Sequence, residues 1–437
     1  MKKVSFETLF EIPLRNGVTK PKKIRGKGYK MVNMGELFSY PIINNISMDR
    51  APLTELEEKN SLLENYDLLF ARQSLVRSGA GQCSIFISDD EKVCFESHII
   101  RCRLDKNKAN PLFYFYLFRS NIGRNIMDTI IEQGAGASGI RGSDLSKLMI
   151  PYIDIKIQND IAEKLFSLDQ KIELNTQTNQ TLEQIAQGIF KHWFIDFAPV
   201  HAKANALARG ETIEQAELAA MACLSGKTVD KITALQTQDP TAYHQLQQTA
   251  AAFPSEFVET EMGQVPKGWE VKKIDEVIQK IPVGKKYSQK TTVPDGKIPV
   301  LDQGKSGIIG FHNDTAGVKA NIQDPVIVFA NHTCYMRLIH FDFSTIQNVF
   351  AFKGKNINIY WIYLATLGKQ KFVEYKGHFP DFLIKQIVVP PKELTEIFGN
   401  IVKDSFSKIA LNLNTNEKLA KTRDLLLPKL LSGEIEL

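Results

Sequence analysis

The sequence predicts an α+β protein in which two mixed α/β domains and two long coiled-coil helices form an internal pseudo-twofold repeat. First, residues 171–182 recur as residues 408–419, at a constant shift of 237 positions in a chain of 437 residues. Second, apolar residues around both copies recur at alternating steps of four and three, which is the coiled-coil period. Third, strand-like and aromatic runs precede each copy in the same order. Self-similarity over such a distance indicates two copies of one structural unit.

The residues before each long helix predict the mixed α/β domains, because matching apolar runs occur in both halves. The matching pairs are residues 4–17 and 271–284 (short helices ending at a glycine turn), 67–71 and 324–330 (buried strands), 113–117 and 360–364 (aromatic helices), and 148–151 and 387–390 (apolar strands ending in proline). The aromatic residues recur at the spacing of core positions, so we interpret them as packing residues rather than base-stacking platforms.

The seam of each long helix is continuous over several heptads. Its members are Ile161, Leu165, Leu168, Ile172, Asn175, Asn179, Leu182, Ala186, Ile189 and Trp193 in the first helix, and Phe398, Val402, Ser405, Ile409, Asn412, Asn416, Leu419, Arg423, Leu426 and Leu430 in the second. Proline and glycine are absent from residues 158–187 and 400–427, so no residue there breaks a helix. About 35 helical residues make a rod of roughly 50 Å.

Each seam carries a pair of asparagines near its middle, and a buried asparagine fixes the register of a coiled coil. Antiparallel pairing of the two helices would place Asn175 near Asn416 and Asn179 near Asn412. Parallel pairing would also align the two pairs, so the asparagines alone do not decide the direction. They could also be polar breaks that face solvent.

Five segments follow from these patterns: a first mixed domain (1–153), a central long helix (154–197), an Ala- and Gln-rich acidic helical connector (198–265), a second mixed domain (266–392) and a C-terminal long helix (393–437). Short helices are expected in the connector near Ile213–Leu224 and Thr241–Ala252. The connector has eight acidic and four basic residues, so its charge is −4. Since the net charge of the whole chain is +5, the rest of the chain carries +9. Positive charge concentrated in the repeated units is typical of proteins that bind a polyanion.

Composition excludes several classes of protein. No apolar run approaches the length of a membrane span, and the N-terminus lacks the apolar region of a signal peptide. The five cysteines show no CxxC spacing, so neither a zinc knuckle nor a disulfide framework is expected. We therefore expect a cytoplasmic protein without a membrane contact.

Motifs for catalysis are missing or incomplete. Gly226-Lys227-Thr228 and Gly304-Lys305-Ser306 match only the end of a phosphate-binding P-loop, and no Asn/Asp-Pro-Pro-aromatic motif of an amino methyltransferase is present. Asp90-Glu91-Lys92 is the best candidate for a metal-dependent nuclease site, but acidic residues between two strands are more typical of a hairpin turn. We expect no catalytic residue and no metal site.

Five motifs carry a resemblance to a known family. They are Gln158-Asn159-Asp160-Ile161-Ala162, Lys171-Ile172-Glu173-Leu174-Asn175, the aromatic run 190–197 (Phe-Lys-His-Trp-Phe-Ile-Asp-Phe), residues 263–270 (Gly-Gln-Val-Pro-Lys-Gly-Trp-Glu) and residues 426–435 (Leu-Leu-Pro-Lys-Leu-Leu-Ser-Gly-Glu-Ile). Together they resemble the specificity subunit of type I restriction–modification enzymes over essentially the whole chain.

The resemblance implies that the mixed domains are target-recognition domains and that the two long helices are antiparallel. Each domain would read one half of a split site in double-stranded DNA, and the helices would set the spacing and dock two methyltransferase subunits. Restriction and translocase subunits would join through the complex. S-adenosylmethionine, ATP and Mg²⁺ would then bind the partner subunits, and this chain would need no cofactor.

The candidates for DNA contact are basic and polar residues in loops, where Arg reads guanine, Asn reads adenine and Lys contacts phosphates. They are Lys22, Lys23, Arg25, Arg72, Arg77 and Arg141 in the first domain, and Lys285, Lys286, Lys305, Asn331, His332 and Lys376 in the second. Each of them could equally be a solvated surface residue.

Two other functions remain open from the sequence. The chain could be a scaffold whose coiled coil assembles partners without DNA, which a lack of sequence-selective footprinting would indicate. It could also be a self-sufficient restriction enzyme, although the missing nucleotide and methyl-donor motifs oppose this.

Overall fold

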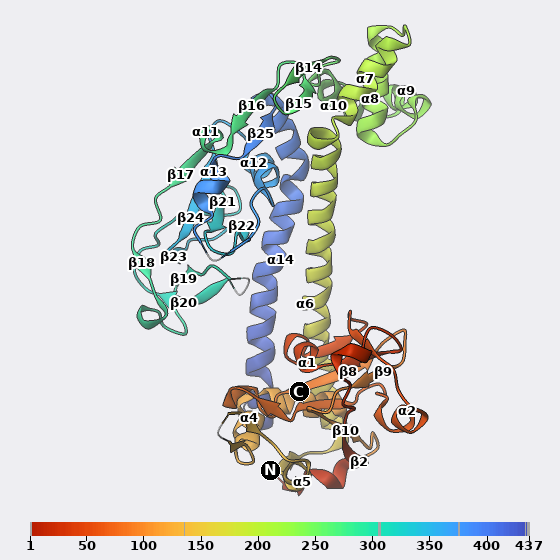
Figure 1. The fold of residues 1–437 in the computed structure, drawn as a ribbon, viewed down its shortest axis with the longest axis vertical. Coiled ribbons are helices and arrows are strands. Elements are labelled where there is room, and N and C mark those ends of the chain that lie inside the picture. The colour runs from red at the N-terminus through yellow and green to blue at the C-terminus, as the bar shows by residue number, and fades with distance from the viewer. Residues whose placement is uncertain (1, 135, 305–306, 375, 433, 435–437) are drawn as a thin grey trace. The chain divides into compact units, whose positions relative to one another are not determined.

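The structure is a computed structural model that describes residues 2–134, 136–304, 307–374, 376–432 and 434. It divides into two compact units (Figure 1): unit 1 contains residues up to 174 together with those from 415 onward, and unit 2 contains residues 175–414. Both divisions fall inside long helices, α6 (Ile155–Phe190) and α14 (Lys392–Ser432), so each unit contains one segment of each helix.

A five-stranded sheet forms the centre of unit 1. Its strands, in spatial order, are β2 (Phe10–Asn16), β10 (Ile99–Leu104), β6 (Leu68–Ala71), β8 (Cys83–Ser88) and β4 (Ile42–Asn44). All neighbours are antiparallel except β4, which runs parallel to β8. All four residues of β6 are fully buried, which explains its uninterrupted apolar sequence.

Smaller elements complete unit 1. The remaining strands are β5 (Asp49–Ala51), β3 (Tyr29–Val32) and β9 (Val93–Phe95) in one sheet, β11 (Glu132–Gln133), β12 (Ser138–Gly139) and β7 (Gln73–Ser74) in another, and the pair β1 (Lys2–Ser5) and β13 (Met149–Tyr152). The helices are α1 (Met34–Ser39), α2 (Glu55–Ser61), α3 (Pro111–Arg119), α4 (Asn121–Asp128) and α5 (Gly142–Lys147), with 3₁₀ turns η1 (Phe6–Leu9), η2 (Lys22–Ile24) and η3 (Arg77–Gly79).

A four-stranded antiparallel sheet is the equivalent in unit 2. Its strands, in spatial order, are β17 (Ile278–Ile281), β24 (Val349–Gly354), β21 (Val326–Ala330) and β22 (Met336–Ile339). The other strands are β18 (Lys286–Tyr287), β23 (Ser344–Ile346), β19 (Ile298–Leu301) and β20 (Ile308–His312) in a second sheet, and the pairs β14 (Phe257–Thr260) with β15 (Gly263–Pro266) and β16 (Glu270–Lys273) with β25 (Gln386–Val389). As in unit 1, the first strand of the mixed domain pairs with the strand that precedes a long helix.

The helices of unit 2 include four that follow α6 directly and pack on one another (Figure 1). They are α7 (Ala198–Ala208), α8 (Ile213–Ser225), α9 (Val229–Gln238) and α10 (Pro240–Ala251). The sequence predicted only the second and the fourth of these. The others are α11 (Ile274–Val277), α12 (Ile359–Thr366) and α13 (Phe379–Leu383), with the 3₁₀ turn η5 (Gln289–Thr291); a π-helical turn (Lys191–Ile195) ends α6.

The aromatic runs lie in the cores of the two units, which confirms the interpretation that they are packing residues. In unit 1, α3 is buried from Phe113 to Phe118, and Phe118 packs edge-on against Phe70 of β6. In unit 2, Trp361 of α12 is fully buried and contacts Phe194 edge-on. These rings are therefore inaccessible to bases.

The internal repeat extends to individual hydrogen bonds. Asn110 caps the N-terminus of α3; its backbone N–H donates to Gln158 Oε1 at 2.9 Å, and its Nδ2 donates to Asn159 Oδ1 at 2.8 Å. The corresponding bonds occur in unit 2. There Asn358 caps α12, its N–H donates to Thr395 Oγ1 at 3.3 Å, and its Nδ2 donates to Glu396 at 2.9 Å. Gln158 and Thr395 are 237 positions apart, as are their successors, so the aromatic helix is attached to the long helix by the same bonds in both halves.

Within unit 2, the segments of α6 and α14 are antiparallel. Asn412 donates from Nδ2 to Asn179 Oδ1 at 2.8 Å, and the ring of Phe398 packs on that of Phe190 at 5.7 Å. The later residue of α6 therefore contacts the earlier residue of α14, as expected for antiparallel helices. Asn175, Asn179 and Asn412 are buried, so these three asparagines do not face solvent.

Within unit 1, the other segments of the same helices are also antiparallel. Asn416 donates to the carbonyl of Ile172 at 3.3 Å, and Arg423 forms an ion pair with Asp169. Tyr116 of α3 donates its hydroxyl to the same carboxylate at 2.6 Å, so Arg423 occupies its seam position as part of a polar cluster. The predicted α+β class with antiparallel long helices is confirmed.

One expectation about local structure is wrong. Residues 4–17 and 271–284 are not short helices; in each, a strand is followed by a single helical turn and a second strand. None of the helices in the described part of the chain is both long and apolar enough to cross a membrane.

Candidate functional site

Both units contain the same arrangement of backbone where the central buried strand ends. In unit 1, Arg72 follows β6; its N–H donates to the carbonyl of His98 at 2.8 Å, and its own carbonyl accepts from Ile140 N–H at 2.9 Å. The equivalent residue in unit 2 is Asn331, which follows β21. Its N–H donates to the Asn348 carbonyl at 2.9 Å, and its carbonyl accepts from His378 N–H at 3.0 Å. We call these arrangements strand-end junction 1 and strand-end junction 2.

A glycine makes the close approach possible in both junctions. A Cβ atom on Gly139 would lie 2.9 Å from the Arg72 carbonyl oxygen, and one on Gly377 would lie 3.0 Å from Asn331 Nδ2. Both glycines immediately precede the residue that donates to the junction. A larger residue in place of Gly139 would meet the Arg72 backbone and push the loop away from the end of the central strand, whereas one in place of Gly377 would crowd the side-chain amide of Asn331.

Junction 1 opens into a polar surface depression of about 340 Å³. Among the residues that line it are Asn16, Arg72, Gln73 and Arg141. Arg141 is exposed and pairs with Glu132 at 2.7 Å, whereas the guanidinium of Arg72 has no hydrogen bond or ion pair within the described residues. The depression therefore presents guanidinium and amide groups that can bind base edges or phosphates.

The other candidates of the first domain lie elsewhere in unit 1. Arg25 donates to the Lys20 carbonyl and to Asn33 Oδ1, each at 2.8 Å, and Asn33 is the N-cap of α1. Arg77 donates to the carbonyl of Asp128 at 3.0 Å, at the C-terminus of α4. Both arginines thus have partners inside the protein, which gives them a structural role at helix ends. Lys22 and Lys23 are exposed in the turn η2.

Junction 2 is a hydrogen-bonded network of side chains. His332 donates its backbone N–H to Gln303 Oε1 at 2.9 Å, and its Nδ1 is 2.8 Å from the Lys376 carbonyl. Its Nε2 is 3.2 Å from Asn348 Nδ2. Because Nδ1 faces a carbonyl, it carries the proton, and Nε2 accepts from the amide. The structure thus brings together three predicted residues, Asn331, His332 and Lys376.

Asn331 itself is buried and serves the fold. Its Oδ1 accepts from the backbone N–H of Phe379 at 2.8 Å, at the start of α13. Lys376 is exposed near Glu374 and Asp381, and the Asp381 carboxylate raises the pKa of Lys376. The exposed groups that a ligand could reach at this junction are therefore the Lys376 ammonium and the edge of the His332–Asn348 pair.

The remaining candidates of the second domain lie outside the junction. Lys285 pairs with Asp314 at 3.0 Å, and this carboxylate raises the pKa of Lys285. Lys286 donates to Thr345 Oγ1 at 3.3 Å, and burial lowers the pKa of Lys286. Lys305 lies outside the described residues.

Sequence reasoning missed several junction residues: Asn16, Gln73, Gln303, Asn348 and His378. A signal for two of them was present, because Asn348 immediately precedes β24, as His98 precedes β10, and Gln73 follows Arg72 directly. The remaining three come from distant segments that only the tertiary fold brings to the junction. No group of three or more His, Cys, Asp or Glu residues able to hold a metal ion occurs among the residues that the structure describes.

Residues 1–184 match the family model of the type I restriction modification DNA specificity domain. The chain is 33% identical over 401 residues to the HindI specificity subunit of Haemophilus influenzae. The alignment covers 84% of this chain and 86% of that protein. It is 25% identical over 347 residues to the MjaIX specificity subunit of Methanocaldococcus jannaschii, covering 74% and 68% of the two proteins. The crystal structure of a type I restriction–modification S subunit from M. genitalium superposes with a TM-score of 0.52 at 16% identity, covering 98% of this chain and 95% of that chain, and shows a similar fold.

Proposed function

The chain belongs to the family of type I restriction enzyme specificity subunits, and we propose that it reads a two-part site in double-stranded DNA, with one strand-end junction for each half. Within this family it is a recognition subunit rather than a catalytic one.

The observation that carries the proposal is the duplication of the junction with different side chains. The backbone bonds at Arg72 and Asn331 are equivalent, yet junction 1 exposes guanidinium and amide groups, whereas junction 2 exposes an imidazole, an amide and an ammonium group. Because base edges are distinguished by their patterns of donors and acceptors, two such surfaces would select different half-site sequences.

Partner subunits would supply the chemistry. We expect two methyltransferase subunits to dock on the long helices, with S-adenosylmethionine bound to them, and ATP and Mg²⁺ to bind restriction and translocase subunits that join the complex. Exposed apolar side chains support this docking: Leu174 and Ile185 on α6 are 56% and 51% exposed, and Leu411 and Leu425 on α14 are 49% and 62% exposed. Single exposed apolar residues are common on protein surfaces, so the support lies in their occurrence on both long helices.

The test is to map methylated sites in a host that carries the complete system. We expect Arg72→Gln to weaken discrimination at one position of one half-site, by about 5- to 150-fold for a lost bidentate contact worth ~1–3 kcal/mol. His332→Ala should alter the other half-site and leave the first unchanged. The matched control is Lys108→Gln, which removes an exposed cation that pairs with Asp105 at 3.0 Å, away from both junctions.

If both variants alter the same half-site, the assignment of one half to each junction is wrong. If both keep full methylation of an unchanged site, the junctions do not contact DNA bases.

A further inference from the structure

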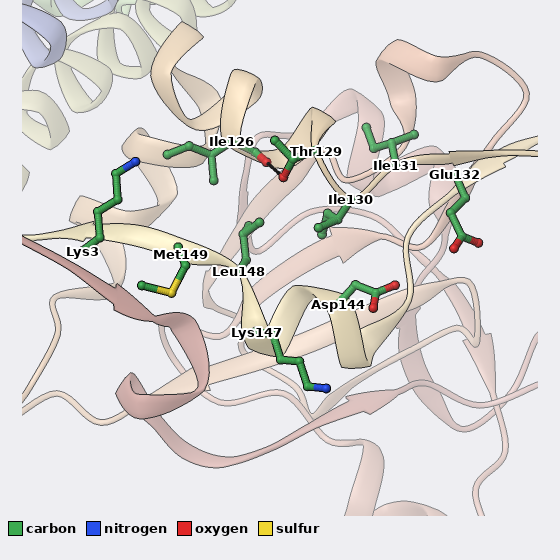
Figure 2. Close-up of a pocket in the computed structure, with 10 residues that line it drawn as sticks. All are labelled: Lys3, Ile126, Thr129, Ile130, Ile131, Glu132, Asp144, Lys147, Leu148 and Met149. Carbon is green, nitrogen blue, oxygen red and sulfur yellow. Dashed lines mark hydrogen bonds between the residues drawn. The ribbon is translucent and has the colours of Figure 1, made fainter.

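A second pocket in unit 1, of about 650 Å³, lies beside the paired strands β2 and β10. Three arginines line it: Arg15 of β2, and Arg101 and Arg103 of β10. It is distinct from the depression near α5 and β13, which Lys3, Lys147, Glu132 and Asp144 surround with charges of both signs (Figure 2). No role in the proposed reading of bases accounts for this concentration of arginines.

Arg101 is the unusual member because it is buried without an ion-pair partner among the described residues. The residue is only 5% exposed, and no acidic residue forms an ion pair with it in the described part of the chain. Nη1 donates to the Leu62 carbonyl at a long 3.5 Å, and Nε has no hydrogen-bond partner among the residues that the structure describes. A buried guanidinium in this state is costly, because its lost hydration is not replaced. Burial accordingly lowers the pKa of Arg101.

Arg103, two residues further along the same strand, is by contrast fully paired. Its Nε and Nη2 donate to the two oxygens of Asp67 at 2.7 and 2.8 Å, and Nη1 pairs with Glu64. The carboxylates within reach are thus already bound to Arg103. Neither carboxylate forms an ion pair with Arg101, although both favour its charged form from a distance and so partly oppose the lowering of its pKa by burial.

The neighbour of Arg101 across the strands increases the local positive charge. Arg15 is directly opposite Arg101 in the register of β2 and β10, and it is exposed. Like charges opposite each other destabilise a pair of antiparallel strands. An anion between the two guanidinium groups would remove both the repulsion and the unsatisfied donors.

The other charged residues of the pocket leave room for an anion. Glu58 pairs with Lys92 at 2.9 Å, so the charge of this carboxylate is already balanced. Lys59 and Glu55, both on α2, contribute one charge of each sign. The four cations and three carboxylates that line the pocket give it a net charge of +1.

We propose that this pocket binds a phosphate group, with Arg101 at its floor and Arg15 at its mouth. Planar guanidinium groups bind tetrahedral phosphates through parallel N–H donors, and two of them can share one phosphate. The phosphate belongs either to the DNA backbone or to a free phosphate compound. The first source rests on the proposed function. It agrees with the path of β10, because Ile99 pairs with Ala71 beside junction 1 and Arg101 is two residues, roughly 7 Å, further along the strand.

The first arm of the test needs no DNA. Thermal unfolding of the full chain is measured with increasing inorganic phosphate at constant ionic strength, for the native protein and for Arg101→Met. In phosphate-free buffer we expect Arg101→Met to unfold at a higher temperature, because an unpaired buried charge has been replaced by an apolar side chain. A purely structural role of Arg101 would lower the unfolding temperature instead. If the source is free phosphate, added phosphate raises the unfolding temperature of the native protein but not that of the variant.

The second arm measures DNA binding of the complex with methyltransferase subunits over a range of salt concentrations. If the source is the DNA backbone, Arg101→Met and Arg15→Gln each reduce the slope of log K against log salt by about one, and the half-site sequences stay the same. Lys108→Gln is the control for loss of a surface cation and should change neither arm.

Either positive arm supports the phosphate pocket and identifies its source. The proposal is overturned if added phosphate has no effect and the salt slope is unchanged. It is also overturned if the only defect of the variants is in assembly with the methyltransferase subunits, because that result would indicate a protein carboxylate as the ligand. Failure of the proposed function is separate: the native complex would then show no sequence selectivity, while the first arm would still decide the phosphate question.

Discussion

At the scale of single residues, buried polar side chains specify how the two long helices meet. Asn179 and Asn412 are 9% and 3% exposed and are joined by one hydrogen bond. Within the described parts of the chain, the Nδ2 of Asn179 has no hydrogen-bond acceptor. The asparagine pair therefore fixes the register of the two helices but costs stability, since an apolar pair would leave no polar group without a hydrogen bond.

We expect Asn412→Leu alone to destabilise the protein by about 1–3 kcal/mol, because Asn179 Oδ1 would be left buried without a donor. The double variant Asn179→Leu/Asn412→Leu should recover most of this loss, since both partners become apolar. Chemical denaturation of the four proteins of the double-mutant cycle measures the coupling free energy.

Asn414→Leu is the matched control, because Asn414 is exposed on the same helix and its replacement should change stability by no more than about 0.5 kcal/mol. A single Asn412→Leu variant as stable as the native protein would show that the hydrogen bond does not set the register.

The candidate site could be predicted from the sequence only in part. Arg72 and Asn331 were identifiable, since each follows a buried strand at equivalent positions of the repeat. Arg25 and Arg77 have the same residue type and lie in loops, but backbone carbonyls and Asn33 are their partners. Nothing in a single sequence distinguishes an arginine that caps a helix from one that faces a ligand.

At the scale of elements, the long helices were the easiest to predict, because a heptad pattern sustained over many residues is typical of a long helix and of few other structures. The segments at residues 4–17 and 271–284 were not, since a strand, a helical turn and a second strand within fourteen residues average to a helix-like pattern. Their pairing with distant strands, as in β1 with β13, decides their structure, and local sequence does not contain it.

The exposed faces of the long helices lead to a prediction about assembly. Leu174 and Ile185 are eleven residues apart on α6, or about three turns, so they lie on one face of that helix. We expect Leu174→Glu/Ile185→Glu to reduce co-purification of the methyltransferase subunits at least tenfold, because charges would enter an apolar contact. Size-exclusion chromatography of the co-expressed subunits measures this.

The control for assembly is Gln187→Glu, which adds a charge at an exposed position on the same helix. Normal assembly of the double variant would show that this face of α6 is not the docking surface.

At the scale of the whole molecule, the two units repeat one design, and the long helices run through both of them. We expect insertion of one helical turn into each long helix to lengthen the preferred DNA spacer, which is the number of base pairs between the two half-sites. The half-site sequences should stay the same, because neither junction is touched. Mapping of methylated sites compares the inserted and native proteins.

Insertion into α6 alone is the control, because it shifts the register of Asn179 against Asn412 and should destabilise the protein instead. An unchanged spacer in a stable protein with both insertions would contradict the role of the helices as a ruler.

The strand-end junctions are fastened through main-chain groups, at Arg72 and at Asn331 alike, with a glycine giving clearance in each. At Arg72 these main-chain bonds leave the side chain open to substitution. At Asn331 the side-chain oxygen also accepts from the Phe379 N–H at 2.8 Å, so substitution in junction 2 is expected at the exposed His332–Asn348 edge and at Lys376 instead. If the junctions read bases as proposed, we expect new target sequences to arise by substitution of exposed junction residues in either half alone.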